Sequence, residues 1–276
     1  VTGPLFLLLI ALMGSAPLLS WRRSSSETLR RNFTFPILFG LAVAVLAFLL
    51  GVRTPFSTLS FGVAGFVLGG ILQEFYRGGK VRRQNKGESW PAAIWQLFRR
   101  SQRRYGGYIV HLGVILVMAA IIGANAYQVE AQANLAQGEA MVIDNYQLRF
   151  AALDQQPGPT YDKVEATLQV SRNGRPAGQV KPAMNFYRSA AGQDQPTNEI
   201  AIRMGLREDL YVVLAGWEGA GESASFKAYV NPLMSWMWIG GLVMIVGALL
   251  ALWPHQTEGQ RVEVRQRTPA AGAPAV

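Results

Sequence analysis

The sequence predicts a membrane protein with about five transmembrane helices and a small all-β domain inserted between the fourth and fifth spans. Three observations predict this class. Half of the 276 residues are hydrophobic, and the mean hydropathy of +0.16 suits a membrane protein that also carries a soluble domain. Several apolar segments approach the roughly 20 residues that span a bilayer. The long stretch before the last of them alternates apolar and polar residues, as half-buried strands do.

The basic loops between the apolar segments predict the orientation of the helices. The segments are Thr2–Leu19, Pro36–Val52, Phe56–Phe75, Gly107–Tyr127 and Leu233–Trp253. Between the third and the fourth there are nine Lys and Arg residues and one acid, Glu88. Because basic loops stay on the cytoplasmic side, this loop and the loop before the second segment are expected inside. The stretch before the fifth segment is then outside.

These assignments divide the chain into four parts. We expect four transmembrane helices with basic cytoplasmic loops in residues 1–127, a periplasmic β domain in 128–230, a fifth helix in 231–254 and a disordered cytoplasmic tail in 255–276. The chain starts without Met, almost inside an apolar run. From this we expect it to be the C-terminal part of a longer protein.

Alternating residues in the outer region predict a β-sandwich or barrel. The Asn173-Gly174 pair is the strongest short hairpin signal, because both residues tolerate a positive φ. The strands are expected over Met141–Leu153, Val164–Ser171, Glu199–Met204, Leu210–Trp217 and Ala224–Val230.

A short amphipathic helix is expected in the second basic loop. Ser89-Trp90-Pro91 looks like an N-cap followed by proline in the first turn. Trp90, Ile94, Leu97 and Phe98 then follow at helical spacing. The helix either lies on the inner membrane face or covers the protein's own surface. The surrounding basic residues indicate topology and contact with anionic lipid, rather than nucleic acid.

The candidate functional residue is His111, the one histidine, acid or base between Arg104 and Glu130. A polar side chain in hydrocarbon is costly and is usually retained for a function. Arg104, Tyr108 and His111 share one helix face with apolar residues, and Arg103 lies beside them. A haem needs such a set: a neutral imidazole for iron, an apolar face for the macrocycle and basic residues for the propionates. The other interpretation is a histidine hydrogen-bonded between helices, with the arginines acting only as topology signals.

A second axial ligand is hard to find in this chain. His255 follows the last apolar segment and is expected to be a solvated tail residue. Met118 lies two turns from His111 on the same helix, so it cannot reach the opposite side of the iron. There is no cysteine, which excludes a thiol nucleophile, a disulfide and a cysteine metal site. Two further features indicate packing and membrane position: the Gly65 and Gly69 pair in the third segment, and Trp236 and Trp238 near the fifth.

The segment from Arg103 to Val114, RRYGGYIVHLGV, resembles the C-terminal half of the CcmF/NrfE-type cytochrome c haem lyases. The segments GSAPLLSWRR from Gly14 and NPLMSWMWIGG from Asn231 are similar to that family in the same order. The resemblance implies a multi-pass protein of the bacterial inner membrane. It also implies a haem b whose iron is held between two intramembrane histidines, of which His111 matches one, with Arg103, Arg104 and Tyr108 nearby.

The resemblance also implies partners. Members of the family take haem from a haem chaperone and attach it to the Cys-x-x-Cys-His motif of apocytochrome c, assisted by thioredoxin-like and apocytochrome-binding partners. The tryptophan-rich segment, the two outer-face histidines and the other intramembrane ligand of the family are absent here and belong to its N-terminal portion. We therefore expect half of the haem b site and no catalytic residue in this chain. Two alternatives remain: a non-catalytic scaffold that presents the β domain to partners, and a transporter subunit.

Overall fold

The computed structural model describes residues 2–19, 25–187, 195–219 and 221–253. The chain forms two compact units. The helical unit comprises residues Val1–Ala47, Leu59–Leu116 and Ile239–Val276, and the β unit comprises Phe48–Thr58 and Val117–Trp238. The predicted tail, with His255, lies outside the described residues.

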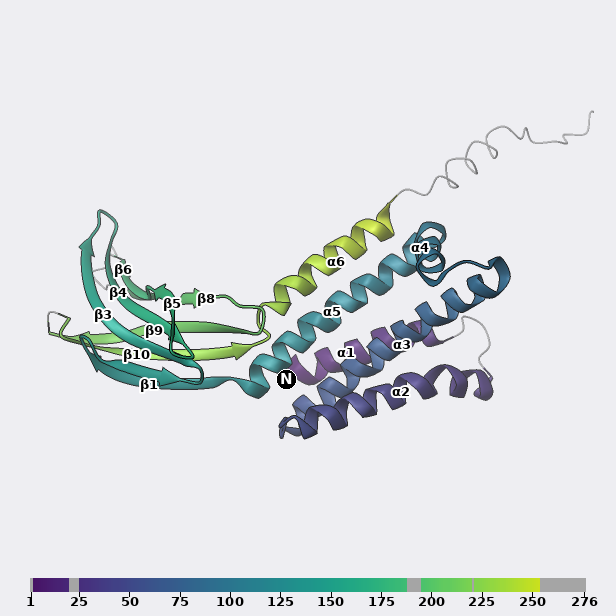
Figure 1. Ribbon diagram of the computed structural model, residues 1–276, viewed down its shortest axis with the longest axis horizontal. Helices are drawn as coiled ribbons and strands as arrows, with labels where there is room; N and C mark the ends of the chain where they lie inside the picture. The colour runs from purple at the N-terminus through teal and green to yellow at the C-terminus, as the bar shows by residue number, and fades with distance from the viewer. Residues whose placement is uncertain (1, 20–24, 188–194, 220, 254–276) are drawn as a thin grey trace, which may run out of the picture. The chain divides into compact units, whose positions relative to one another are not determined.

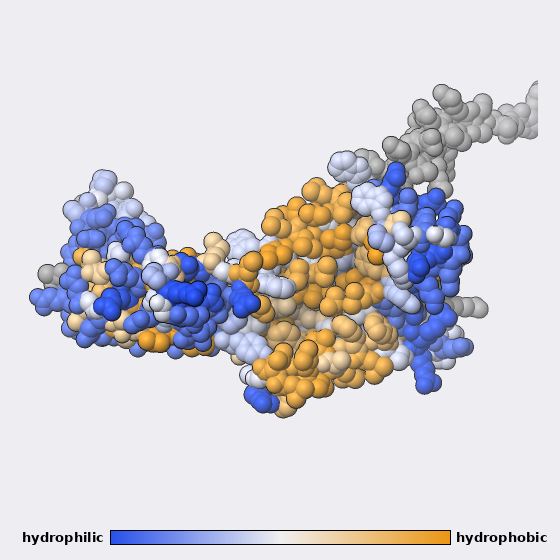
Figure 2. Space-filling view, in the orientation of Figure 1, coloured by the Kyte–Doolittle hydropathy of each residue, from blue (hydrophilic) through white to orange (hydrophobic). Residues whose placement is uncertain are grey.

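The helical part contains three helices that are long and apolar enough to cross a membrane: α2, α3 and α5. Two further apolar segments, Gly3–Leu18 and α6, form shorter helices, so the count of five spans stays a prediction. Figure 2 shows apolar side chains gathered over the helices, with hydrophilic side chains at the end where α4 lies. The helices are α1 (Thr2–Ser15) with the short η1 (Ala16–Leu18), α2 (Ser26–Leu49), α3 (Pro55–Lys86), α4 (Trp90–Arg100), α5 (Gln102–Tyr127) and α6 (Trp236–Leu252).

Three helices extend beyond the apolar segments that predicted them: α2, α3 and α5, of which α5 begins at Gln102 and not at Gly107. Helix α2 begins at Ser26 and continues through Pro36, and α3 continues past Phe75 to Lys86. Lys, Arg, Gln and Glu are good helix formers, so the polar flanks continue the helices beyond the apolar segments. Hydropathy marks the apolar part of each helix and not its ends.

Glycines allow the helices to approach closely. A Cβ on Gly65 of α3 would lie 2.7 Å from the Cβ of Val43 in α2, so the predicted role of this glycine in packing agrees with the structure. In the same way, a Cβ on Gly113 of α5 would lie 2.6 Å from the carbonyl oxygen of Gly240 in α6. Helix α6 therefore covers the glycine face of α5.

Helix α4 packs against the protein's own surface, which is the second of the two interpretations offered by its sequence. The Trp90 ring stacks on Tyr76 of α3 with the ring centroids 5.6 Å apart, and the Phe98 ring lies 5.6 Å from that of Phe75. Ala93 is fully buried, whereas 63% of the Trp95 surface is exposed on the other side. Ser89 occupies the N-cap position without a side-chain hydrogen bond.

The β domain is a sandwich of two sheets, as the alternating pattern predicts (Figure 1). One sheet has the order β1-β10-β9-β8, and the other has the order β2-β3-β4-β6-β7 with β5 paired to β4. The strands are β1 (Val129–Ala136), β2 (Ala140–Ile143), β3 (Tyr146–Pro157), β4 (Tyr161–Arg172), β5 (Arg175–Val180), β6 (Ala183–Tyr187), β7 (Gln195–Glu199), β8 (Ala201–Arg203), β9 (Glu208–Glu218) and β10 (Ser223–Pro232).

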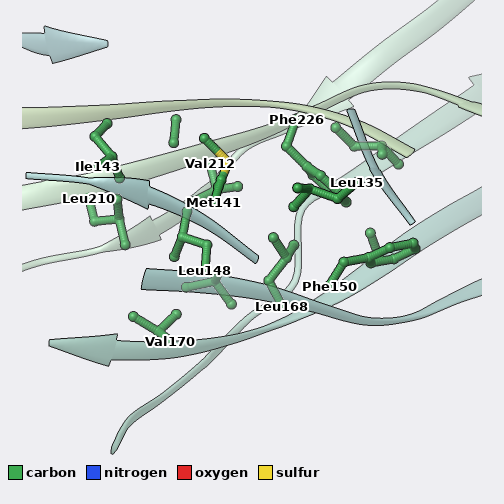
Figure 3. Packing of buried hydrophobic residues seen from close by; sticks show 14 of the residues in the cluster. Leu135, Met141, Ile143, Leu148, Phe150, Leu168, Val170, Leu210, Val212 and Phe226 are labelled. Carbon is green, nitrogen blue, oxygen red and sulfur yellow. The ribbon is translucent and has the colours of Figure 1, made fainter. Parts of the chain in front are cut away.

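The core of the sandwich lies between the two sheets. Phe150 of β3 and Phe226 of β10 are both fully buried, and their ring centroids are 5.2 Å apart. Leu168, Leu210 and Val212 are also fully buried, and Figure 3 shows their side chains packed with the two phenylalanines between the strands. The domain therefore has a hydrophobic core of its own.

The Asn173-Gly174 hairpin is as predicted, because both residues have positive φ values, 49° and 75°, and join β4 to β5. The single strand predicted over Met141–Leu153 is wrong. The chain turns at Asp144, whose φ is 48°, and forms the β2–β3 hairpin. The strand predicted over Glu199–Met204 is present as the shorter β8 (Ala201–Arg203), whereas Glu199 is the last residue of β7 in the other sheet.

Two valines allow a matched test of the core. Val212 is fully buried on β9, whereas 68% of the Val142 surface on β2 is exposed. We expect Val212→Ala to lower the free energy of unfolding of the domain by about 2 kcal/mol, because the lost methyl groups leave a cavity. Val142→Ala should change it by less than about 0.5 kcal/mol. Hydrogen exchange of the core strands in the detergent-solubilised protein measures both, and equal effects would contradict this core.

An ion-pair cluster makes the stability of the domain depend on pH. Lys163 Nζ lies 3.0 Å from one Glu165 oxygen and Lys181 Nζ lies 3.1 Å from the other. The hydrogen bond from Lys163, assisted by that from Lys181, lowers the pKa of the Glu165 carboxyl. Because the pKa is lowered in the folded state, the ionised Glu165 carboxylate contributes to the stability of the domain above the ordinary Glu pKa of about 4.3. This contribution is lost as the pH falls through the folded-state value.

We therefore expect Glu165→Gln to lose less stability on acidification than the wild type. Near neutral pH, the dependence of its free energy of unfolding on pH should change little. The measurement is the free energy of unfolding of the domain as a function of pH. Glu130→Gln, at an exposed glutamate on β1, is the control and should leave the wild-type profile intact. If Glu165→Gln lost stability at low pH as the wild type does, the ion pairs between the two lysines and this carboxyl would not contribute to the pH dependence.

Candidate functional site

His111 lies on the part of α5 that belongs to the helical unit. Two faces of this helix are covered. Gly106 and Gly113 face α6, and Tyr108 packs on Phe75 of α3 with the ring centroids 6.2 Å apart. At 3.6 residues per turn, His111 lies between these two faces. Its side chain is therefore only partly buried, because it lies at the edge of the contacts that α5 makes with α3 and α6.

The imidazole of His111 packs against the ring of Tyr108. The centroids are 6.4 Å apart and the rings meet edge to face. No residue in the described part of the chain forms a hydrogen bond with this imidazole. The alternative in which His111 is hydrogen-bonded between helices therefore has no support within residues 2–19, 25–187, 195–219 and 221–253.

Gly107, one turn before His111, leaves open space on the same side of the helix. A Cβ built on Gly107 would meet no atom within 4 Å, whereas a Cβ on Gly106 would lie 2.6 Å from the backbone nitrogen of Ala251 in α6. The small residues of this motif therefore do two things. Gly106 admits a neighbouring helix, and Gly107 leaves a bare stretch of surface beside His111.

Arg104 and Tyr108 form a polar cluster with an acid on the neighbouring helix. The Arg104 guanidinium pairs with the carboxylate of Glu74 in α3. Its Nε donates to the Tyr108 hydroxyl at 3.5 Å, and that hydroxyl donates to Glu74, also at 3.5 Å. Over half of the Arg104 side chain, 57%, stays exposed. The Arg104 side chain is therefore held by Glu74 and is still accessible to a further anionic group.

The role of Glu74 goes beyond what the sequence indicated. The sequence predicts that Arg104 binds a haem propionate and does not single out Glu74. Glu74 is the one acid in α3, and this isolation in an otherwise basic and apolar helix was the available signal. Arg103 is exposed and lies about 100° around α5 from Arg104, so the two arginines face different directions.

No second ligand for a metal comes from the described residues. Among them there is no cluster of three or more His, Cys, Asp or Glu side chains that could hold an ion. Met118 is buried two turns from His111 on the same helix. One imidazole in an apolar helix, without a hydrogen-bond partner among the described residues, fits a single axial bond to haem iron. The donor set does not fit a polydentate metal centre.

Comparison with known proteins relates this chain to one group. Residues 126–232 match the family described as "CcmF C-terminal beta-sandwich". The cytochrome c-type biogenesis protein CcmF of Haemophilus influenzae is 28% identical over 251 residues, which cover 89% of this chain and 36% of that protein. The probable cytochrome c-type biogenesis protein NrfE of Escherichia coli is 31% identical over 145 residues, which cover 52% of this chain and 26% of that protein.

A solved structure agrees with these relatives. The structure titled "Cytochrome c Heme Lyase CcmF" superposes with a TM-score of 0.71 and 28% sequence identity, covering 92% of this chain and 39% of that one. The matches to CcmF of Haemophilus influenzae and to this structure cover about nine-tenths of this chain. The chain therefore spans little more than a third of the length of these relatives. Its helices and its β-sandwich together correspond to the C-terminal part of the CcmF/NrfE-type cytochrome c biogenesis proteins.

Proposed function

We propose that this chain supplies one axial ligand of a haem b, through His111, within a haem lyase that matures cytochrome c. One observation carries the proposal. The imidazole of His111 lies in an apolar helix beside the open surface at Gly107, and no described residue forms a hydrogen bond with it. A polar side chain in such a place is costly without a partner, and an iron atom is a partner that satisfies its free nitrogen.

The surrounding residues have supporting roles in this proposal. The Tyr108 ring lies edge-on to the imidazole and restricts its rotation. Arg104, held by Glu74 and still more than half exposed, is placed to receive a propionate, and Arg103 is the second candidate for that role. When bound, haem would supply an iron centre that accepts and releases single electrons. The chain itself contributes the ligand, the apolar surroundings and the cationic rim.

The relatives suggest the wider context. By this analogy the protein lies in the bacterial inner membrane with the β domain on the periplasmic side. It acts with the N-terminal portion of the lyase, which supplies the second histidine. The complete lyase receives haem from a haem chaperone and attaches it to apocytochrome c, together with thioredoxin-like and apocytochrome-binding partners. The bare surface at Gly107 is where the N-terminal portion would meet α5.

The test is the haem content of the protein purified together with the N-terminal portion. We expect His111→Ala to lose most of the reducible b-type absorbance, because the iron loses an axial bond. His111→Gly should also lose it, and added imidazole should restore part of the absorbance by binding in the vacated space. Rescue of this kind distinguishes a ligand from a residue that only supports the fold.

Met118→Leu is the matched control on the same helix face and should keep the wild-type spectrum, because Met118 is buried and lies two turns from His111. Unchanged haem content in His111→Ala would refute the proposal. The scaffold function would then be the better explanation, and deletion of the β domain should in that case abolish co-purification with partners while leaving any spectrum intact.

A further inference from the structure

A cationic cavity lies where α3, α4 and α5 come together. Its volume is about 480 Å³, and four arginines line it: Arg77, Arg82, Arg100 and Arg104. They come from all three helices, so the cavity exists only when the helices are packed. Gly78 allows that packing, since a Cβ there would lie 2.5 Å from the Tyr105 hydroxyl and 3.0 Å from Leu97. Figure 2 shows hydrophilic side chains gathered at this end of the helical unit.

Two of the four arginines are neutralised by acids and two are not. Arg104 pairs with Glu74, and Arg82 pairs with Glu88 through hydrogen bonds of 2.6 and 2.9 Å. Arg77 instead donates to neutral acceptors, the Asn32 side chain at 2.8 Å and the Arg31 carbonyl at 3.1 Å. Arg100 is exposed at the end of α4 and forms no salt bridge in the described part of the chain, although Glu88, which is already paired with Arg82, attracts it electrostatically. The cavity therefore carries an excess positive charge.

The cavity lies at the boundary of the apolar segments. Arg77 is the first basic residue of α3 after a run of apolar turns, and Arg104 is the last one of α5 before its apolar part begins. Both helices are long and apolar enough to cross a membrane. Val81 and Leu97 add apolar walls, and 55% of the Val81 surface is exposed. Cationic groups beside apolar walls at this level match a phospholipid, with its phosphate at the boundary and its chains in the apolar layer.

We propose that this cavity binds the phosphate group of an anionic phospholipid, with Arg77 and Arg100 as its principal cationic contacts. Arginine suits this ligand because its planar guanidinium can donate two hydrogen bonds to phosphate oxygens. The lipid occupies the groove between α3 and α4 and helps to hold the amphipathic helix in place. The cavity shares Arg104 with the proposed haem site, but its principal contacts, Arg77 and Arg100, do not belong to that site.

The experiment titrates the purified protein in detergent with phosphatidylglycerol or phosphatidylcholine and counts bound lipid by native mass spectrometry. We expect one phosphatidylglycerol molecule to be retained in preference to phosphatidylcholine. Arg100→Gln should weaken its binding roughly fivefold, the effect expected for one basic residue beside an anionic lipid. Arg99→Gln is the matched control, because Arg99 neighbours Arg100 at the same end of α4 but does not line the cavity. It should bind lipid as the wild type does.

Three outcomes would overturn the proposal. Equal weakening in Arg99→Gln and Arg100→Gln would indicate a diffuse attraction to the surface. Retention of both lipids alike would show that the headgroup charge is not recognised. Displacement of the lipid by soluble glycerol phosphate at equal concentration would mean that a free phosphate is the ligand. The haem spectrum of Arg100→Gln is measured in parallel and should be unchanged, which separates this site from the proposed haem ligand.

Discussion

Polar groups cannot hydrogen-bond to water inside the apolar layer of a membrane, and this constraint governs the whole helical unit. Gln73, buried in α3, donates to the backbone carbonyl of Asn32 at 2.9 Å. Ser15 donates to the carbonyl of Ala11 at 2.7 Å. In contrast to these groups, the imidazole of His111 forms no hydrogen bond with any described residue. The proposed bond to haem iron would give this imidazole the partner that the described residues do not supply.

The packing of α5 determines where that partner can lie. Helix α6 approaches the face with Gly106 and Gly113 so closely that a side chain would not fit. Phe75 of α3 occupies the face with Tyr105 and Tyr108. His111 lies on the helix face between these two. Gly107 lies beside it, and a Cβ there would meet no atom within 4 Å. Glycines and aromatic rings thus bring the helices together on two sides and leave a third side free.

Local signals in the sequence predicted the parts of the fold that depend on local chemistry. Asn173-Gly174 encodes its own turn through two positive φ angles, so that hairpin was predictable. Asp144 also turns the chain, but it lies within an apolar alternation that hid the break between β2 and β3. The pair between Arg104 and Glu74 joins residues 30 positions apart, so the isolation of Glu74 in its helix marks it as unusual but does not identify its partner. His111 could be singled out because its isolation is visible in the sequence itself.

The β domain begins and ends on neighbouring strands. Val129, which follows α5 after one intervening residue, pairs with Val230 near the end of β10, just before α6. The chain thus leaves and rejoins the helices at almost one point. A fold with this connection can gain or lose an entire domain without altering the helices that flank it.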